Sequence, residues 1–188
     1  MEAFSDGVLA VIITIMVLEM KAPHTVSLIS LKPLIPVFIS YVLSFIFIGL
    51  YWNNHHHLLQ ASEKVNGKIL WANLHLLFWL SLIPFLTSWI GENSFAPWPV
   101  ALYGVDLLGA SIAYHILTHT LINYHGKKST LAKAHGYGIK ERLSIVFYLL
   151  AIPLAFYFSW GSYVLYILVA AMWLVPDRRI ECYLEKFH

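Results

Sequence analysis

The chain has 188 residues, of which 59% are hydrophobic and only 12% are charged, and its formal net charge is +2. Soluble domains carry about 25% charged residues, so this composition excludes an ordinary soluble protein, and the small net charge gives no indication of nucleic-acid binding. A single cysteine, Cys182, excludes an internal disulfide and a multi-cysteine metal site. The composition therefore favours a protein surrounded mainly by lipid.

Apolar segments of about the 20 residues needed to cross a bilayer recur along the chain. In chain order, we expect membrane-spanning helices at residues 3–20, 34–52, 69–90, 100–122, 143–160 and 163–175. Pro84 and Pro153 lie inside two of these segments, where we expect kinks. The weak alternation typical of a membrane β-barrel does not occur in the sequence. The predicted fold class is therefore all-α, with residues 1–188 forming a single six-helix transmembrane domain.

Basic residues gather in the loops that would lie on the same side of the membrane as both termini. Of the 12 Lys and Arg residues, all but Lys21 and Lys32 fall in these segments. Cytoplasmic loops are enriched in Lys and Arg. We therefore expect a multi-pass protein of the cell membrane with both termini in the cytoplasm.

The first expected helix carries an apolar stripe. At 100° per residue, Val11, Ile15 and Leu18 lie on one side at spacing i, i+4, i+7, and Thr14 flanks them. Between Asp6 and Glu19 the segment has no charged residue. Such a stripe more often packs in a core or faces lipid, but it is also typical of a pore wall that controls ions by hydrophobic constriction.

Asp6 lies about 140° around the helix from Val11, so it faces different neighbours. A carboxylate against lipid is costly, and we expect Asp6 to turn towards the chain's own helices. The candidate partners are His55, His56 and Asn73. A favourable interaction with the helix dipole would also account for an acidic residue at this position.

The stretch Phe4-Ser5-Asp6-Gly7, followed by VLAVIITIMVLEM, resembles the first-helix signature of the transmembrane protein 175 family. These are the endosomal and lysosomal potassium channels of animals and their short bacterial relatives. Similar stretches are Trp52-Asn53-Asn54-His55-His56, Leu70-Trp71-Ala72-Asn73-Leu74, Ile83-Pro84-Phe85 and Pro176-Asp177-Arg178-Arg179. The resemblance therefore covers most of the chain.

The resemblance implies a K⁺-permeable homotetramer in the lipid bilayer, without cofactor or metal and without a TVGYG filter, whose first helices line a central pore. It assigns the pore constriction to Val11, Ile15 and Leu18, and support of potassium preference to Thr14. Ser5 and Asp6 match residues that brace the pore helix against its own subunit. The family has an Arg or Lys four residues before this Phe, a position that would precede Met1, so we expect a His of the 55–57 run, or a basic residue of another loop, to serve beside Asp6 instead.

Other functions stay open from the residues alone. His115 and His119, at i, i+4 in the fourth segment, and His75 in the third could ligate haem or a metal in an electron-transfer protein. A secondary transporter would need polar groups at a helix break, and the residues around the two prolines offer none. No catalytic set or phosphate-binding loop occurs, so we do not expect an enzyme.

Two further acidic residues can each be interpreted as functional or as structural. Glu19 and Asp106 could enrich cations near the outer mouth of a pore. Alternatively, Glu19 anchors a helix end and Asp106 makes a structural hydrogen bond. The histidine run at 55–57 is most simply a solvated helix end.

Overall fold

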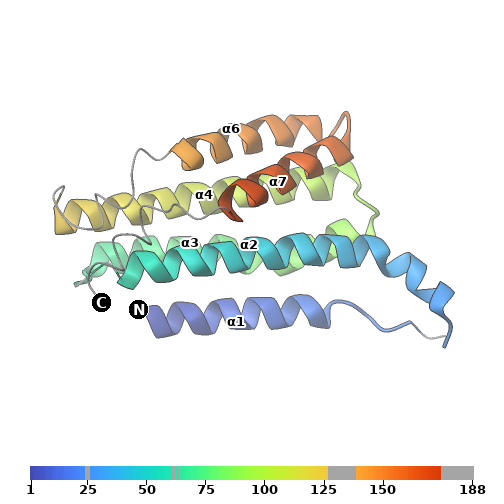
Figure 1. The fold of residues 1–188 in the computed structure, drawn as a ribbon, viewed down its shortest axis with the longest axis horizontal. Coiled ribbons are helices and arrows are strands. Elements are labelled where there is room, and N and C mark those ends of the chain that lie inside the picture. Colours follow the sequence, from blue (N-terminus) through green and yellow to red (C-terminus); the bar gives the residue numbers. More distant parts are fainter. Residues whose placement is uncertain (24–25, 61, 63, 127–138, 175–188) are drawn as a thin grey trace.

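A computed structural model describes residues 1–23, 26–60, 62, 64–126 and 139–174. These residues form helices and no strand, in the order α1 (Glu2–Leu18), η1 (Leu28–Leu34), α2 (Ile35–Gln60), α3 (Gly67–Glu92), α4 (Pro97–His125), α6 (Ile139–Leu154) and α7 (Ser159–Leu174). Consecutive α-helices run in opposite directions along roughly parallel axes, which lie horizontally in Figure 1. The all-α prediction is confirmed.

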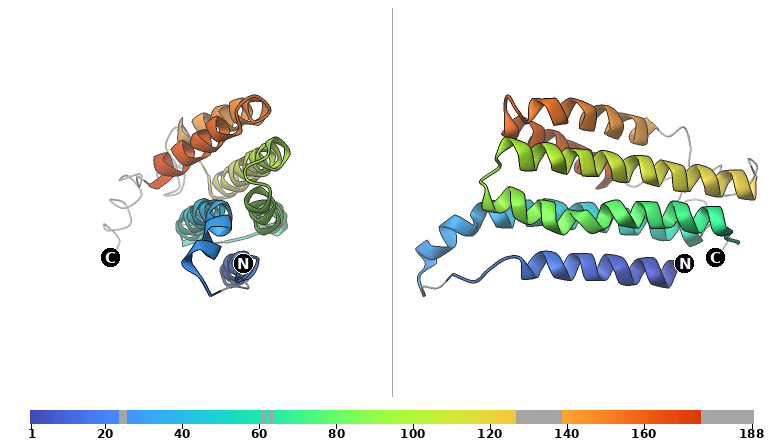
Figure 2. Two further views of the ribbon diagram at one scale, coloured as in Figure 1. Left: turned by 90° about the vertical axis from the view of Figure 1, so that its right-hand side faces the viewer. Right: turned by 180° about the vertical axis from the view of Figure 1, so that it is seen from behind.

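The six α-helices are stacked from one edge of the molecule to the other (Figures 1 and 2). α1 lies at one edge against α2 and α3, α4 packs on α3, and α6 and α7 form the opposite edge. Because α1 stands at the edge, it offers one face to the bundle and leaves the other uncovered.

In the described part of the chain, three helical segments are long and apolar enough to cross a bilayer on their own: Leu28–Gln60, Gly67–Glu92 and Pro97–His125. α1 has 17 residues, and the described parts of α6 and α7 have 16 each. At 1.5 Å per residue, these shorter helices extend about 25 Å, close to the thickness of the hydrocarbon core.

Two expected segment ends were wrong. α2 continues to Gln60, about two turns beyond residue 52, so the histidine run lies inside the helix and His55 is only 1% exposed.

α6 ends at Leu154, directly after Pro153, and a tight turn leads into α7. Pro153 therefore lies in the last turn of α6, directly before a chain reversal, and not at a kink within a longer helix. The sixth expected segment ends at residue 175, which is outside the described residues, as are Pro176, Asp177, Arg178 and Arg179.

α2 and α3 approach each other closely at Gly91. A Cβ atom on Gly91 would lie 2.5 Å from the Cα of Val37 and 3.0 Å from the Oγ of Ser40. Ser40 Oγ also donates a hydrogen bond across this contact to the carbonyl oxygen of Thr87, at 3.1 Å. The absence of a side chain at Gly91 therefore allows the two backbones to meet.

Gly91→Ala is expected to lower the free energy of unfolding by about 1–3 kcal/mol, because the added methyl group would force the helices apart. Gly49→Ala on α2 is the matched control, since a Cβ there meets nothing within 4 Å. Thermal unfolding of the purified protein in detergent measures both. Equal melting temperatures for the two variants would contradict the close approach at Gly91.

Candidate functional site: the first helix

α1 has one buried face and one exposed face. Ser5, Leu9, Ile12 and Met16 follow the spacing i, i+4, i+7, i+11 and are 0–3% exposed against the bundle. The exposed stripe, defined as Val11, Ile15 and Leu18, is 54%, 41% and 77% exposed. One subunit therefore leaves the predicted stripe uncovered.

A groove of about 1120 Å³ runs beside the exposed stripe, between α1 and α3. Phe4, Gly7, Val11 and Ile15 form part of its wall on α1. Small residues also line it, among them Ala3 on α1 and Ser81 and Ser88 on α3. Phe85 and Trp89 of α3 lie in the same wall, so the groove combines small and aromatic side chains.

Thr14 lies beside the exposed stripe. Its Oγ1 donates a hydrogen bond to the carbonyl oxygen of Val11, at 2.9 Å, within the same helix. The hydroxyl is therefore already bonded to the backbone, which suits a role in the shape of α1 more than direct contact with an ion.

Buried polar side chains join α1 to α2 and α3. Asn73 Nδ2 donates to Ser5 Oγ at 2.9 Å, and Asn73 Oδ1 lies 2.6 Å from His55 Nε2. A carbonyl oxygen only accepts, so His55 Nε2 carries the proton in this arrangement. Ser5, His55 and Asn73 are at most 2% exposed. We call these residues the anchoring network.

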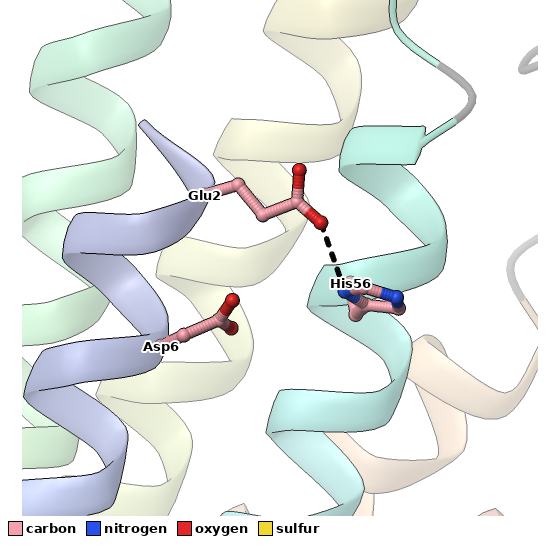
Figure 3. Close-up of side chains that lie close together, drawn as sticks. All are labelled: Glu2, Asp6 and His56. Atoms are coloured by element: carbon pink, nitrogen blue, oxygen red, sulfur yellow. Dashed lines mark ion pairs between the residues drawn. The ribbon is translucent and has the colours of Figure 1, made fainter.

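Asp6 has a different partner from those expected. Trp52 Nε1 donates to Asp6 Oδ1 at 3.0 Å. His56 instead places its Nδ1 3.0 Å from Glu2 Oε1 (Figure 3), and His55 and Asn73 bond to each other within the anchoring network. The antiparallel register explains this: moving four residues forward on α1, from Glu2 to Asp6, moves four residues back on α2, from His56 to Trp52.

Asp106 fits neither of its expected roles. Its side chain is buried within the subunit, with 2% of the residue exposed, so it cannot line a mouth. Neither carboxylate oxygen has a hydrogen-bond partner in the described part of the chain. Glu19, in contrast, is exposed just after α1 and lies in the wall of the groove.

The histidines considered for haem or metal have protein neighbours. His75 Nε2 accepts from Trp79 Nε1 at 3.1 Å, and His115 Nδ1 lies 2.7 Å from Glu141 Oε2. Within the described ranges, the side chains grouped closely enough to hold a metal ion are Glu2, Asp6 and His56, and His75, His115 and His119 do not belong to that group.

Known proteins identify the family. The family described as endosomal/lysosomal potassium channel TMEM175 matches residues 1–84. A potassium channel of Chryseobacterium sp. (strain P1-3) is 54% identical over 186 residues, which cover 99% of this chain and 97% of that protein. The chain belongs to the TMEM175 potassium channel family.

Other relatives agree. A potassium channel of Streptomyces collinus is 29% identical over 124 residues, or 62% of this chain and 60% of that protein. The crystal structure of a lysosomal potassium-selective channel TMEM175 homolog from Chamaesiphon minutus matches with a TM-score of 0.78 and 29% identity, covering 93% of this chain and 94% of that one. The resemblance seen in the sequence is confirmed, and this TMEM175 member is a membrane protein whose relatives are channels and not enzymes.

Proposed function

We propose that four copies of this chain form a passive K⁺ channel in the cell membrane, with the exposed stripe of each α1 around a central pore. The observation that carries the proposal is the uncovered apolar edge of α1. Val11, Ile15 and Leu18 are exposed in the single subunit and match the pore positions expected from the family, and Val11 and Ile15 also lie in the wall of the groove.

The ring of four Ile15 side chains is the proposed gate. Packed closely, it excludes water and therefore ions, and a modest dilation wets it. Because side chains rather than a cage of backbone carbonyls meet the ion, preference for K⁺ over Na⁺ arises from partial dehydration at the ring and is modest. Thr14 supports this preference by holding the helix shape next to Ile15.

The contacts of α1 suggest how the ring could widen. Polar side-chain contacts with α2 and α3 involve Glu2, Ser5 and Asp6, all within the first two turns. In the described residues, the half of α1 beyond Asp6 is held by apolar packing through Leu9, Ile12 and Met16. Apolar packing is less directional than hydrogen bonding, so the proposed opening is a tilt about the fixed first turns.

The charge pattern supports the orientation. Lys68, Lys140 and Arg142 lie in the first turns of α3 and α6, at the end of the bundle where α1 begins. Lys21 and Lys32 lie near the opposite end. By the positive-inside rule, the termini face the cytoplasm, and Glu19 attracts cations at the outer mouth.

Cysteine modification tests which helix lines the pore. In a Cys182→Ser background, Leu18→Cys is expected to lose most K⁺ flux in liposomes when a cationic thiol reagent is added, because the label fills the pore. Leu168→Cys on α7, which is 49% exposed, is the control and is expected to keep its flux. Block of Leu168→Cys alone, or no block of either variant, would place the ion path elsewhere.

A further inference from the structure

Glu2, Asp6 and His56 form a compact group at the junction of α1 and α2 (Figure 3). One ligand atom from each side chain can be chosen so that all lie within 4.8 Å of one another. All three residues are partly buried, so the group is shielded by protein yet reachable from water. Two carboxylates and one imidazole supply two oxygen ligands and one nitrogen ligand.

Neighbouring side chains orient two of these ligands. Trp52 donates to Asp6 Oδ1 and also stacks on His56, with ring centroids 5.7 Å apart and an interplanar angle of 23°. The side-chain amide of Gln60 lies 2.9 Å from His56 Nε2, and with its oxygen turned to that nitrogen it would accept the Nε2–H proton of an imidazole that ligates through Nδ1. Partners of this kind fix ring orientation at metal sites.

His56 Nδ1 is the nitrogen that remains for a ligand. It is shielded from solvent and has no hydrogen-bond partner in the described part of the chain, although Glu2 Oε1 lies 3.0 Å away. Asp6 likewise keeps Oδ2 available when Oδ1 accepts from Trp52. One ligand atom from each of Glu2, Asp6 and His56 therefore lies near the others across two helices, with Glu2 Oε1 already paired to His56 Nδ1.

We propose that Glu2, Asp6 and His56 bind a divalent first-row transition ion, with Zn²⁺ as the reference ion. Zn²⁺ takes nitrogen and carboxylate oxygen ligands at about 2.0–2.2 Å, and three protein ligands leave a fourth position for water. Ca²⁺ and Mg²⁺ prefer sites made of oxygen alone, so the imidazole favours a transition ion. The ion takes the place of a proton on His56 and neutralises the facing carboxylates.

The ion would tie α1 to α2 on the side of α1 away from the exposed stripe. Its effect on conduction rests on the proposed function: a tie next to the fixed end of α1 restrains the tilt that widens the Ile15 ring. Zn²⁺ is then expected to lower K⁺ flux.

Calorimetric titration of the full chain in detergent and K⁺ buffer with Zn²⁺ tests the site. The expected result is one Zn²⁺ bound per chain, at least about 100-fold weaker in His56→Ala and about tenfold weaker in Trp52→Phe, which removes an orienting contact. His75→Ala is the matched control: this exposed histidine lies outside the group, and its loss is expected to leave the affinity unchanged.

Unchanged Zn²⁺ affinity in both His56→Ala and Glu2→Gln would overturn the proposal. So would displacement of Zn²⁺ by equimolar Mg²⁺, which would indicate binding by carboxylates alone. The titration measures Zn²⁺ binding and not conduction, so its result can be interpreted even if the proposed channel mechanism is wrong. Zn²⁺ that binds at His56 yet leaves K⁺ flux unchanged would disprove the restraint on α1.

Discussion

Ile15→Asn is expected to raise K⁺ flux through reconstituted protein by at least about tenfold, which corresponds to a barrier lower by about 1.4 kcal/mol. Four Asn side chains would replace four apolar ones at the narrowest ring. Their amides hydrogen-bond to water, so the ring would stay wet in the closed arrangement. Selectivity is expected to fall at the same time, because a wetter ring removes less of the ion's hydration shell.

Ile112→Asn is the matched control for this experiment. Ile112 lies on α4 and is 42% exposed, against 41% for Ile15, so the same substitution is made at equal exposure away from α1. K⁺ and Na⁺ fluxes into liposomes are measured for both variants at equal protein incorporation. A flux from Ile15→Asn no larger than that from the parent, or an equal rise in Ile112→Asn, would argue against an Ile15 gate.

Asn73→Ala is expected to lower the free energy of unfolding by about 2–5 kcal/mol. Asn73 bonds to Ser5 and to His55, and all three side chains are buried. Its loss leaves His55 Nε2 without its partner and removes the hydrogen bond donated to Ser5 Oγ, which keeps its own bond to the carbonyl oxygen of Met1, and each lost interaction costs about 1–3 kcal/mol. Because this network fixes the first turns of α1, the variant is also expected to pack that helix less firmly.

Asn53→Ala provides the comparison, because Asn53 is an exposed asparagine on α2. Melting temperatures of both variants in the same detergent show which substitution lowers the stability more. Hydrogen exchange of the α1 amides should accelerate in Asn73→Ala and stay at the parental rate in Asn53→Ala. If both variants unfold at the parental temperature, the network does not hold α1.

The sequence predicts the presence of the helices well because each contains an apolar run, and a bilayer requires such runs in the segments that cross it. The fifth segment shows the limit. Its hydropathy continues through residues 155–160, and only backbone geometry decides that the chain turns after Pro153 instead of bending there. Similarly, hydropathy stops at Trp52, but the polar residues after it continue the helix because they find partners on α1 and α3.

The face of α1 that carries the exposed stripe follows from helical periodicity, which one sequence contains. The partner of Asp6 cannot be predicted from helical periodicity, because it depends on the register between α1 and α2. A signal was nonetheless present: Glu2 and Asp6 are four residues apart, and so are Trp52 and His56. Two antiparallel helices with such pairs can match them in only a few registers, and the indole N–H of Trp52 needs an acceptor.

The exposed stripe is short along its axis. From Val11 to Leu18 the helix rises about 10 Å, and in the proposed pore this is a short apolar constriction without a row of polar groups to hold successive ions. Conduction that relies on one ion pushing the next needs neighbouring occupied sites. Ions should therefore cross independently, so that the ratio of opposing tracer fluxes follows the electrochemical gradient with an exponent near one, and mixtures of K⁺ and Rb⁺ should give conductances between those of the pure salts.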